Sequence, residues 1–308
     1  MDALPYEFVE SVLDTLPIVT FENTNMLNHN VWNSVSVKLK RRKTMKASLT
    51  FLTNDVFCVF THHGVEFQFE QVLKMSPLPL ISHITVGEII DSNLHACKTI
   101  SENNFTHRFI PFLISRLSDV YLVIDSVQSR LLAVFLQKFS QKTHCGYVDL
   151  NYNGPAAMDF LLNIISKIRS NCTISLSGDW PREIVPTLEE CLFEDKICLD
   201  TRKSSIVFTL DFVEKYIKFC KITIGANGIS RRLYANTNFE INEINGIAKG
   251  LKCDQYFKWM DDPKGTLRVE GMTHNNVKGI SIAANYCQCH LDSVNSGYCD
   301  HCEREWYW

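Results

Sequence analysis

Apolar side chains recur in alternating pairs along the middle of the chain, and the first members of successive pairs lie 23 to 26 residues apart. Alternation with a period of two predicts a β-strand that is buried on one side. The segments between the pairs have apolar residues at helical spacing, so the sequence predicts units of strand, turn and helix. The pairs are Leu122/Ile124, Val148/Leu150, Ile174/Leu176, Ile197/Leu199 and Ile222/Ile224.

A strand–helix unit of this size cannot bury its own apolar face, so successive units are expected to stack on one another. The predicted fold class is α/β: a short α-helical head, a strand–helix solenoid that resembles leucine-rich repeats, and a small Cys-rich tail. The corresponding segments are residues 1–46, 47–284 and 285–308.

Strand residues that alternate with the buried pairs are expected to point away from the helices. We expect this strip to bind a protein partner, and the alternative is that these polar side chains are merely solvated. Its residues are Asp149, Asn151, Ser175, Ser177, Asp200 and Thr223.

The N-terminal segment has the pattern of a short amphipathic helix over residues 3–17, with a tryptophan further along the chain. This pattern resembles a divergent F-box, in which a Leu-Pro pair opens a helix and a tryptophan closes the motif. The resemblance implies contact with the small adaptor subunit of cullin-RING ubiquitin ligases. The residues that carry it are Leu4, Pro5, Phe8, Val12, Leu13, Leu16 and Trp32.

The whole chain is also similar to large nematode families that pair a degenerate F-box with a substrate-facing region, through elements such as ISLSGDWP at residues 174–181. An alternative for the N-terminal helix is a cap over the open end of the repeats, because an uncapped end would expose core.

The C-terminal tail contains two close pairs of cysteines, Cys287 with Cys289 and Cys299 with Cys302. Zinc prefers four thiolate or imidazole ligands in a tetrahedron, and two short turns can supply them. The tail is therefore a candidate zinc site, and no other cofactor is indicated. The alternatives are an unstructured tail of reduced thiols or an extension anchored by Trp306, Tyr307 and Trp308.

The overall charge of the chain limits the kinds of partner that we expect. The net charge of −3 creates no general attraction for nucleic acid or membrane. The acidic N-terminus does not resemble a signal peptide, and a cytoplasmic location is expected, with the basic cluster Lys38–Lys46 as an alternative nuclear signal.

The chain contains none of the common catalytic motifs GxSxG, GxxxxGK[ST], GxGxxG or HExxH, so enzymatic activity is not expected.

Head and repeats together predict a substrate-recognition subunit of a cullin-RING ubiquitin ligase. Its expected partners are the ligase adaptor and a protein target, without nucleic acid or membrane. The alternative is a scaffold that binds proteins without any ligase.

Overall fold

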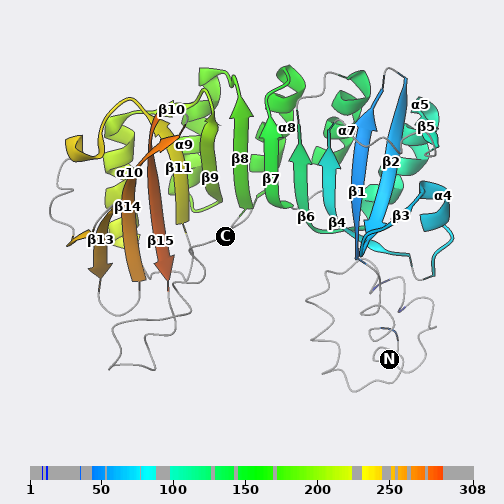
Figure 1. The fold of residues 1–308 in the computed structure, drawn as a ribbon, viewed down its shortest axis with the longest axis horizontal. Helices are drawn as coiled ribbons and strands as arrows, with labels where there is room; N and C mark the ends of the chain where they lie inside the picture. Colours follow the sequence, from blue (N-terminus) through cyan, green and yellow to red (C-terminus); the bar gives the residue numbers. More distant parts are fainter. Residues whose placement is uncertain are drawn as a thin grey trace. The chain divides into compact units, whose positions relative to one another are not determined.

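The computed structural model describes most of the chain between residues 44 and 286 (Figure 1). The described residues are 9, 12, 35, 44–52, 54–76, 78–87, 98–125, 129–141, 145–168, 172–223, 231–244, 251–253, 256–261, 265–274 and 277–286. They divide into two compact units. Unit 1 comprises Met1–Asp149 and Asn153–Ser166, and unit 2 comprises Leu150–Tyr152 and Lys167–Trp308.

Unit 1 is built on a mixed sheet with the strand order β7-β6-β4-β1-β2-β3, and β5 pairs with β2. β1 runs parallel to β4, which runs parallel to β6, whereas β2 is antiparallel to β1, β3 and β5. The strands are β1 (Thr44–Phe51), β2 (Asp55–His62), β3 (Val65–Phe67), β4 (Leu80–Val86), β5 (Thr99–Ser101), β6 (Leu117–Ile124) and β7 (Cys145–Asn151).

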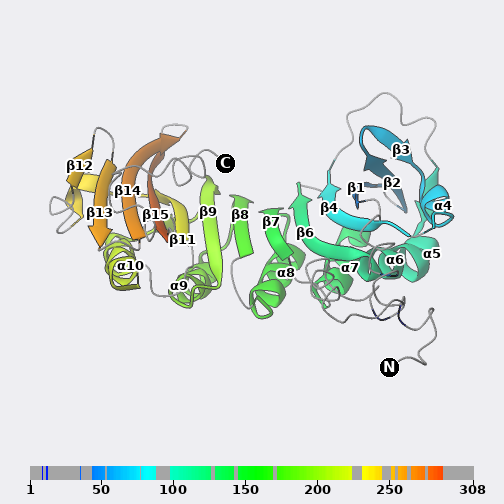
Figure 2. The ribbon, with the colours of Figure 1, turned by 90° about the horizontal axis from the view of Figure 1, so that it is seen from below.

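Helices cover one face of this sheet, as Figure 2 shows for α5 to α8. They are α4 (Phe69–Val72), α5 (Glu102–Asn104), the π-helical turn η3 (Phe105–Phe109), α6 (Ile110–Ser115), α7 (Arg130–Ser140) and α8 (Pro155–Ile165). Ser129 caps α7 by accepting a hydrogen bond from the backbone of Leu131. Over β4, β6 and β7, no helix of the described chain covers the opposite face, which we call the open face.

The core of unit 1 is a network of phenylalanines between sheet and helices. Phe60 of β2 lies against Phe69 and Phe109, and Phe105 lies edge-on to Phe51 with 5.5 Å between ring centroids. These rings are almost completely buried. Each such side chain contributes about 1.5–3 kcal/mol to folding.

Unit 2 has the strand order β12-β13-β14-β15-β11-β9-β8, and β10 pairs with β11. β8, β9 and β11 are parallel, whereas β11 to β15 are joined by antiparallel pairs. The strands are β8 (Cys172–Gly178), β9 (Ile197–Ser204), β10 (Val207–Phe208), β11 (Arg231–Thr237), β12 (Leu251–Cys253), β13 (Tyr256–Asp261), β14 (Gly265–His274) and β15 (Val277–Tyr286). The helices are the 3-10 turns η4 (Arg182–Ile184) and η5 (Ile241–Glu243), α9 (Val185–Phe193) and α10 (Leu210–Thr223).

One ion pair in unit 2 is buried. The guanidinium of Arg231, whose side chain is only 4% exposed, donates hydrogen bonds to both carboxylate oxygens of Asp195. Arg231 also donates to the carbonyl of Thr223 at the end of α10 and lies over the ring of Phe219. The pair therefore ties the start of β11 to the turn that precedes β9.

The predicted architecture of a short helical head followed by a strand–helix solenoid is wrong, because the structure is a mixed α/β fold. Strand and helix alternate only from β6 to β9. The connection between β1 and β2 spans residues 52–54, and so short a link can only join antiparallel strands. The chain beyond β11 is likewise antiparallel, so the 25-residue spacing described only the middle of the chain.

Four of the five predicted strand pairs are confirmed, since Leu122, Val148, Ile174 and Ile197 are buried in β6 to β9. The fifth is wrong. Ile222 belongs to helix α10 and is 73% exposed, and the strand follows at Arg231–Thr237. Apolar residues at helical spacing, Phe212, Val213, Tyr216, Ile217 and Cys220, extend the helix through this segment. A short alternating run cannot be distinguished from the end of such a helix.

Among the described residues, no helix is both long enough and apolar enough to cross a membrane.

Candidate binding surface

Three aromatic side chains stack across the open face of unit 1, and we call them the aromatic ladder: His83 of β4, Tyr121 of β6 and Tyr147 of β7. The ring centroids of His83 and Tyr121 are 5.1 Å apart, and their planes are inclined by 26°. Those of Tyr121 and Tyr147 are 3.9 Å apart and nearly parallel, at 3°. The ladder crosses three neighbouring strands in a direct line.

The strand registers explain this alignment. Tyr121 precedes the buried Leu122, and Tyr147 precedes the buried Val148, so both tyrosines point to the open face. His83 pairs directly with Tyr121. The register of β4 against β1 shifts by one residue at Ser82, and this irregularity brings His83 opposite Lys46 of β1.

The polar surroundings of His83 hold its ring in place and disfavour its charged form. The hydroxyl of Ser82 lies 2.9 Å from Nδ1 of His83. Burial lowers the pKa of His83, and the neighbouring positive charge of Lys46 lowers it further. The ladder therefore presents a neutral imidazole at neutral pH, with a cation beside it.

The ladder is accessible on its outer side, because Tyr121 remains 38% exposed and Tyr147 and His83 are half-buried. Tyrosine combines a large apolar ring with a polar tip, and it is enriched in protein interfaces for this reason. Asp149 follows Tyr147 on the same side of β7. The arrangement offers a rigid aromatic surface with Lys46 at one end and Asp149 at the other.

The sheet of unit 2 carries a different arrangement on β9 and β11. Arg202 donates hydrogen bonds to both carboxylate oxygens of Asp200, and its guanidinium carbon lies 4.6 Å from the ring centroid of Tyr234. Tyr234 pairs with Asp200 across the two strands. The hydrogen bonds to Asp200 position the guanidinium of Arg202 beside the tyrosine, and they raise its pKa further, so it stays charged.

The strip of strand residues that was predicted to bind a partner is only partly present on the sheet. Asp149 lies in unit 1, and Asn151, Ser175, Ser177 and Asp200 lie in unit 2, all half-buried at strand positions that alternate with buried residues. Ser175 and Asp200 are direct neighbours across β8 and β9.

Two members of the strip have other structural roles. The carboxylate of Asp200 binds Arg202 within the chain. The placement of Thr223 on a strand is wrong, because it ends helix α10 and its hydroxyl donates to the carbonyl of Phe219.

Most of the predicted adaptor-binding residues, Leu4, Pro5, Phe8, Leu13, Leu16 and Trp32, lie outside the described residues. Val12 is described as helical and half-buried, and Val9 and Val35 are helical and fully buried. The predicted zinc ligands Cys287, Cys289, Cys299 and Cys302 also lie outside the described part of the chain.

Within the part that is described, no group of three or more His, Cys, Asp or Glu side chains could hold a metal ion. Three cysteines of unit 2, Cys191, Cys198 and Cys220, lie in surroundings that favour packing over reactivity. Burial raises the pKa of Cys220 to about 12 and also raises the pKa values of Cys191 and Cys198. The nucleophilic thiolate form is therefore disfavoured at these three positions.

The aromatic ladder was not predicted, although the sequence pattern indicates the orientation of two of its three residues. The alternation that directed Asp149 outward also directs Tyr147 and Tyr121 outward, two aromatic residues at equivalent positions of successive strands. His83 carried no such signal, because its orientation depends on the irregularity at Ser82.

No family model, no curated protein and no solved structure matches the chain.

Proposed function

We propose that this protein binds a polypeptide partner through the open face of unit 1, with the aromatic ladder as the centre of the contact. The observation that carries the proposal is the stacking of His83, Tyr121 and Tyr147 on a sheet face that no described helix covers. Rings already held by their neighbours lose little conformational freedom when a partner covers them. Tyrosines in such positions often dominate binding energy.

The ladder also suggests how specificity would arise. A partner segment over the rings would meet Lys46 at the β1 end, so an acidic side chain at that end of the segment favours one orientation. Apolar contact with the rings would supply most of the affinity.

We further propose that the partner is a target for ubiquitination and that the N-terminal segment recruits the ligase adaptor. The F-box resemblance of Leu4, Pro5, Phe8 and Trp32 supports this part. Tethering a target close to a ligase raises its effective concentration near the transferred ubiquitin. The alternative remains a scaffold that binds the same partner without a ligase.

Affinity purification of the tagged full-length protein, with quantitative identification of co-purifying proteins, tests both parts separately. Tyr121→Thr with Tyr147→Thr should reduce target recovery by about ten-fold or more while adaptor recovery is unchanged. Leu4→Asp with Phe8→Asp should abolish adaptor recovery and preserve target recovery.

Leu162→Thr is the matched control, since Leu162 is 39% exposed on helix α8 of the same unit. Target recovery that survives loss of both tyrosines would contradict the ladder as the binding centre. An adaptor that never co-purifies with the intact protein would favour the scaffold.

A further inference from the structure

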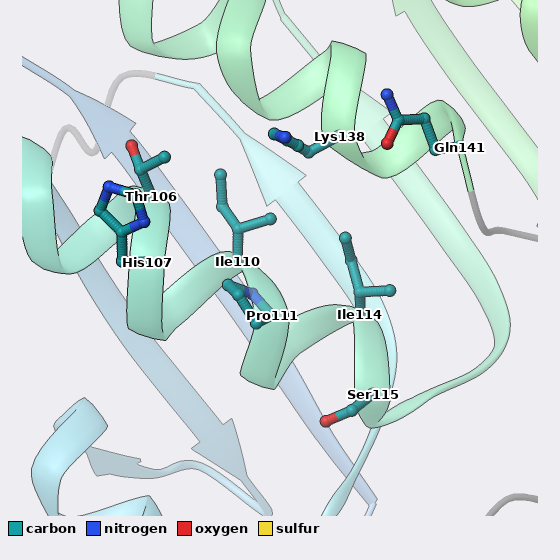
Figure 3. A pocket seen from close by; sticks show the side chains of 8 residues that line it. All are labelled: Thr106, His107, Ile110, Pro111, Ile114, Ser115, Lys138 and Gln141. Carbon is teal, nitrogen blue, oxygen red and sulfur yellow. The ribbon is translucent and has the colours of Figure 1, made fainter.

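A groove on the helical side of unit 1 has a chemistry that the proposed function does not use. It lies between the segment η3–α6 and the C-terminal end of α7, and its volume is about 570 Å³ (Figure 3). Figure 3 shows the side chains of Ile110 and Ile114 pointing toward α7, with Lys138 and Gln141 across from them. The lining is completed by Thr106, His107, Pro111 and Ser115.

Pro111 explains why the helix is irregular at this point. In a regular α-helix, the proline ring would clash with the carbonyl four residues earlier, which is that of His107. The turn directly before Pro111 is π-helical instead, and the backbone N–H of Ile110 donates to the carbonyl of Phe105. This wider turn contributes Thr106 and His107 to the rim of the groove, and π-helical turns frequently mark functional sites.

The apolar part of the groove has the spacing of a helix-binding surface. Ile110 and Ile114 lie one helical turn apart, and the exposed Pro111 lies between them in sequence. An amphipathic helix in a groove uses apolar side chains separated by three or four residues. Ile110 is only 1% exposed and forms the floor of the groove, so two such side chains could contact Pro111 and Ile114, three residues apart, in one register.

The rim of the groove carries one positive charge, that of Lys138. Nearby Arg108 lies 3.6 Å from a carboxylate oxygen of Glu70, and nearby Arg130 forms an ion pair with Glu102. Among the residues that the structure describes, no carboxylate pairs with Lys138 or His107, and no acidic residue lines the groove.

We propose that this groove binds an acidic amphipathic helix of a partner protein. Apolar side chains of that helix contact Pro111 and Ile114, and a carboxylate of its polar face pairs with Lys138. The groove is thus a second docking surface, which is separate from the aromatic ladder and does not depend on it.

Fluorescence anisotropy with the full-length protein tests this proposal. The probe is a labelled synthetic amphipathic helix with leucines along one face and glutamates beside them, and the control peptide carries lysine in place of every glutamate. We expect the acidic peptide to bind saturably, and Lys138→Glu to weaken its binding by about ten-fold. Added salt should weaken binding as well, because ion pairs at an exposed rim are screened.

Lys218→Glu is the matched control, since Lys218 is an exposed lysine on helix α10 of unit 2, and it should leave binding unchanged. Ile114→Gln tests the apolar contact and should also weaken binding, with circular dichroism confirming that the variant is folded. Equal binding of both peptides, no effect of Lys138→Glu, or displacement of the peptide by a fatty acid would overturn the proposal.

Discussion

Tyr121 and Tyr147 stack face to face across β6 and β7, with 3.9 Å between their ring centroids and 3° between their planes. Both belong to strands whose opposite sides are fully buried at Leu122 and Val148. The buried residues hold the backbone, so the two rings are positioned by the sheet and not by each other alone. A double-mutant cycle can separate these contributions.

Urea unfolding of Tyr121→Thr, Tyr147→Thr and the double variant measures the coupling between the two rings. Threonine keeps strand propensity while it removes the ring. We expect a coupling free energy of about 0.5–1.5 kcal/mol, the range of stacked aromatic pairs. Strictly additive losses would mean that the rings contribute nothing to each other.

Asp195→Asn should destabilise unit 2 strongly. The substitution keeps the shape of the side chain and tolerates the positive φ of 58° at this position, but it leaves the buried guanidinium of Arg231 without its counter-ion. Loss of one partner of a buried pair costs about 3–5 kcal/mol. The midpoint of chemical denaturation provides the measurement.

Asp211→Asn serves as the control for this variant. Asp211 and Lys215 form an exposed pair one helical turn apart in the same unit, so loss of this pair should leave the denaturation midpoint almost unchanged. Similar losses for the two variants would show that burial of the Arg231 pair does not matter.

Gly178→Ala should be destabilising for two reasons that can be separated. Gly178 has a φ of +85°, and an added Cβ would lie 2.6 Å from Oδ1 of Asn151. Backbone strain alone costs about 1–3 kcal/mol. In the background of Asn151→Ala, the clash is removed and only the strain remains, so Gly178→Ala should cost less there. An equal cost in both backgrounds would argue against the clash.

The stability of unit 1 should fall in mildly acidic solution because of His83. Its pKa is below the ordinary value of 6.5 in the folded protein, so the unfolded chain binds the proton more readily. The contribution is complete above the ordinary value and is lost as the pH falls toward the folded pKa. His83→Gln should therefore show a flatter dependence of unfolding free energy on pH in this range. The same slope in both proteins would remove His83 as the cause.

The strands and helices from β6 to β9 could be predicted from the sequence because apolar alternation and helical spacing report local burial. Val148 and Leu150 predicted β7, and the helical spacing of the segment that follows them predicted α8. The wider architecture could not be predicted from these patterns, because they do not determine which strands pair. The antiparallel pairing of β11 with β15 joins segments far apart in the chain.

The candidate site shows the same limit. Outward positions of single strands could be identified, as for Asp149, but the stacking of Tyr121 on Tyr147 depends on how two strands align. The irregularity at Ser82 that directs His83 into the ladder has no signature in the sequence. The groove had one local signal, because Pro111 interrupts an otherwise helical segment.

Site-specific photo-crosslinking tests the central claim most directly. A photoreactive phenylalanine analogue would replace Tyr121 on the open face in one protein and Leu162 on helix α8 in another, two positions of nearly equal exposure at 38% and 39%. In cells, we predict crosslinks to a protein partner from position 121 and none to that partner from position 162. Crosslinks to the same partner from position 162 alone would contradict binding at the open face.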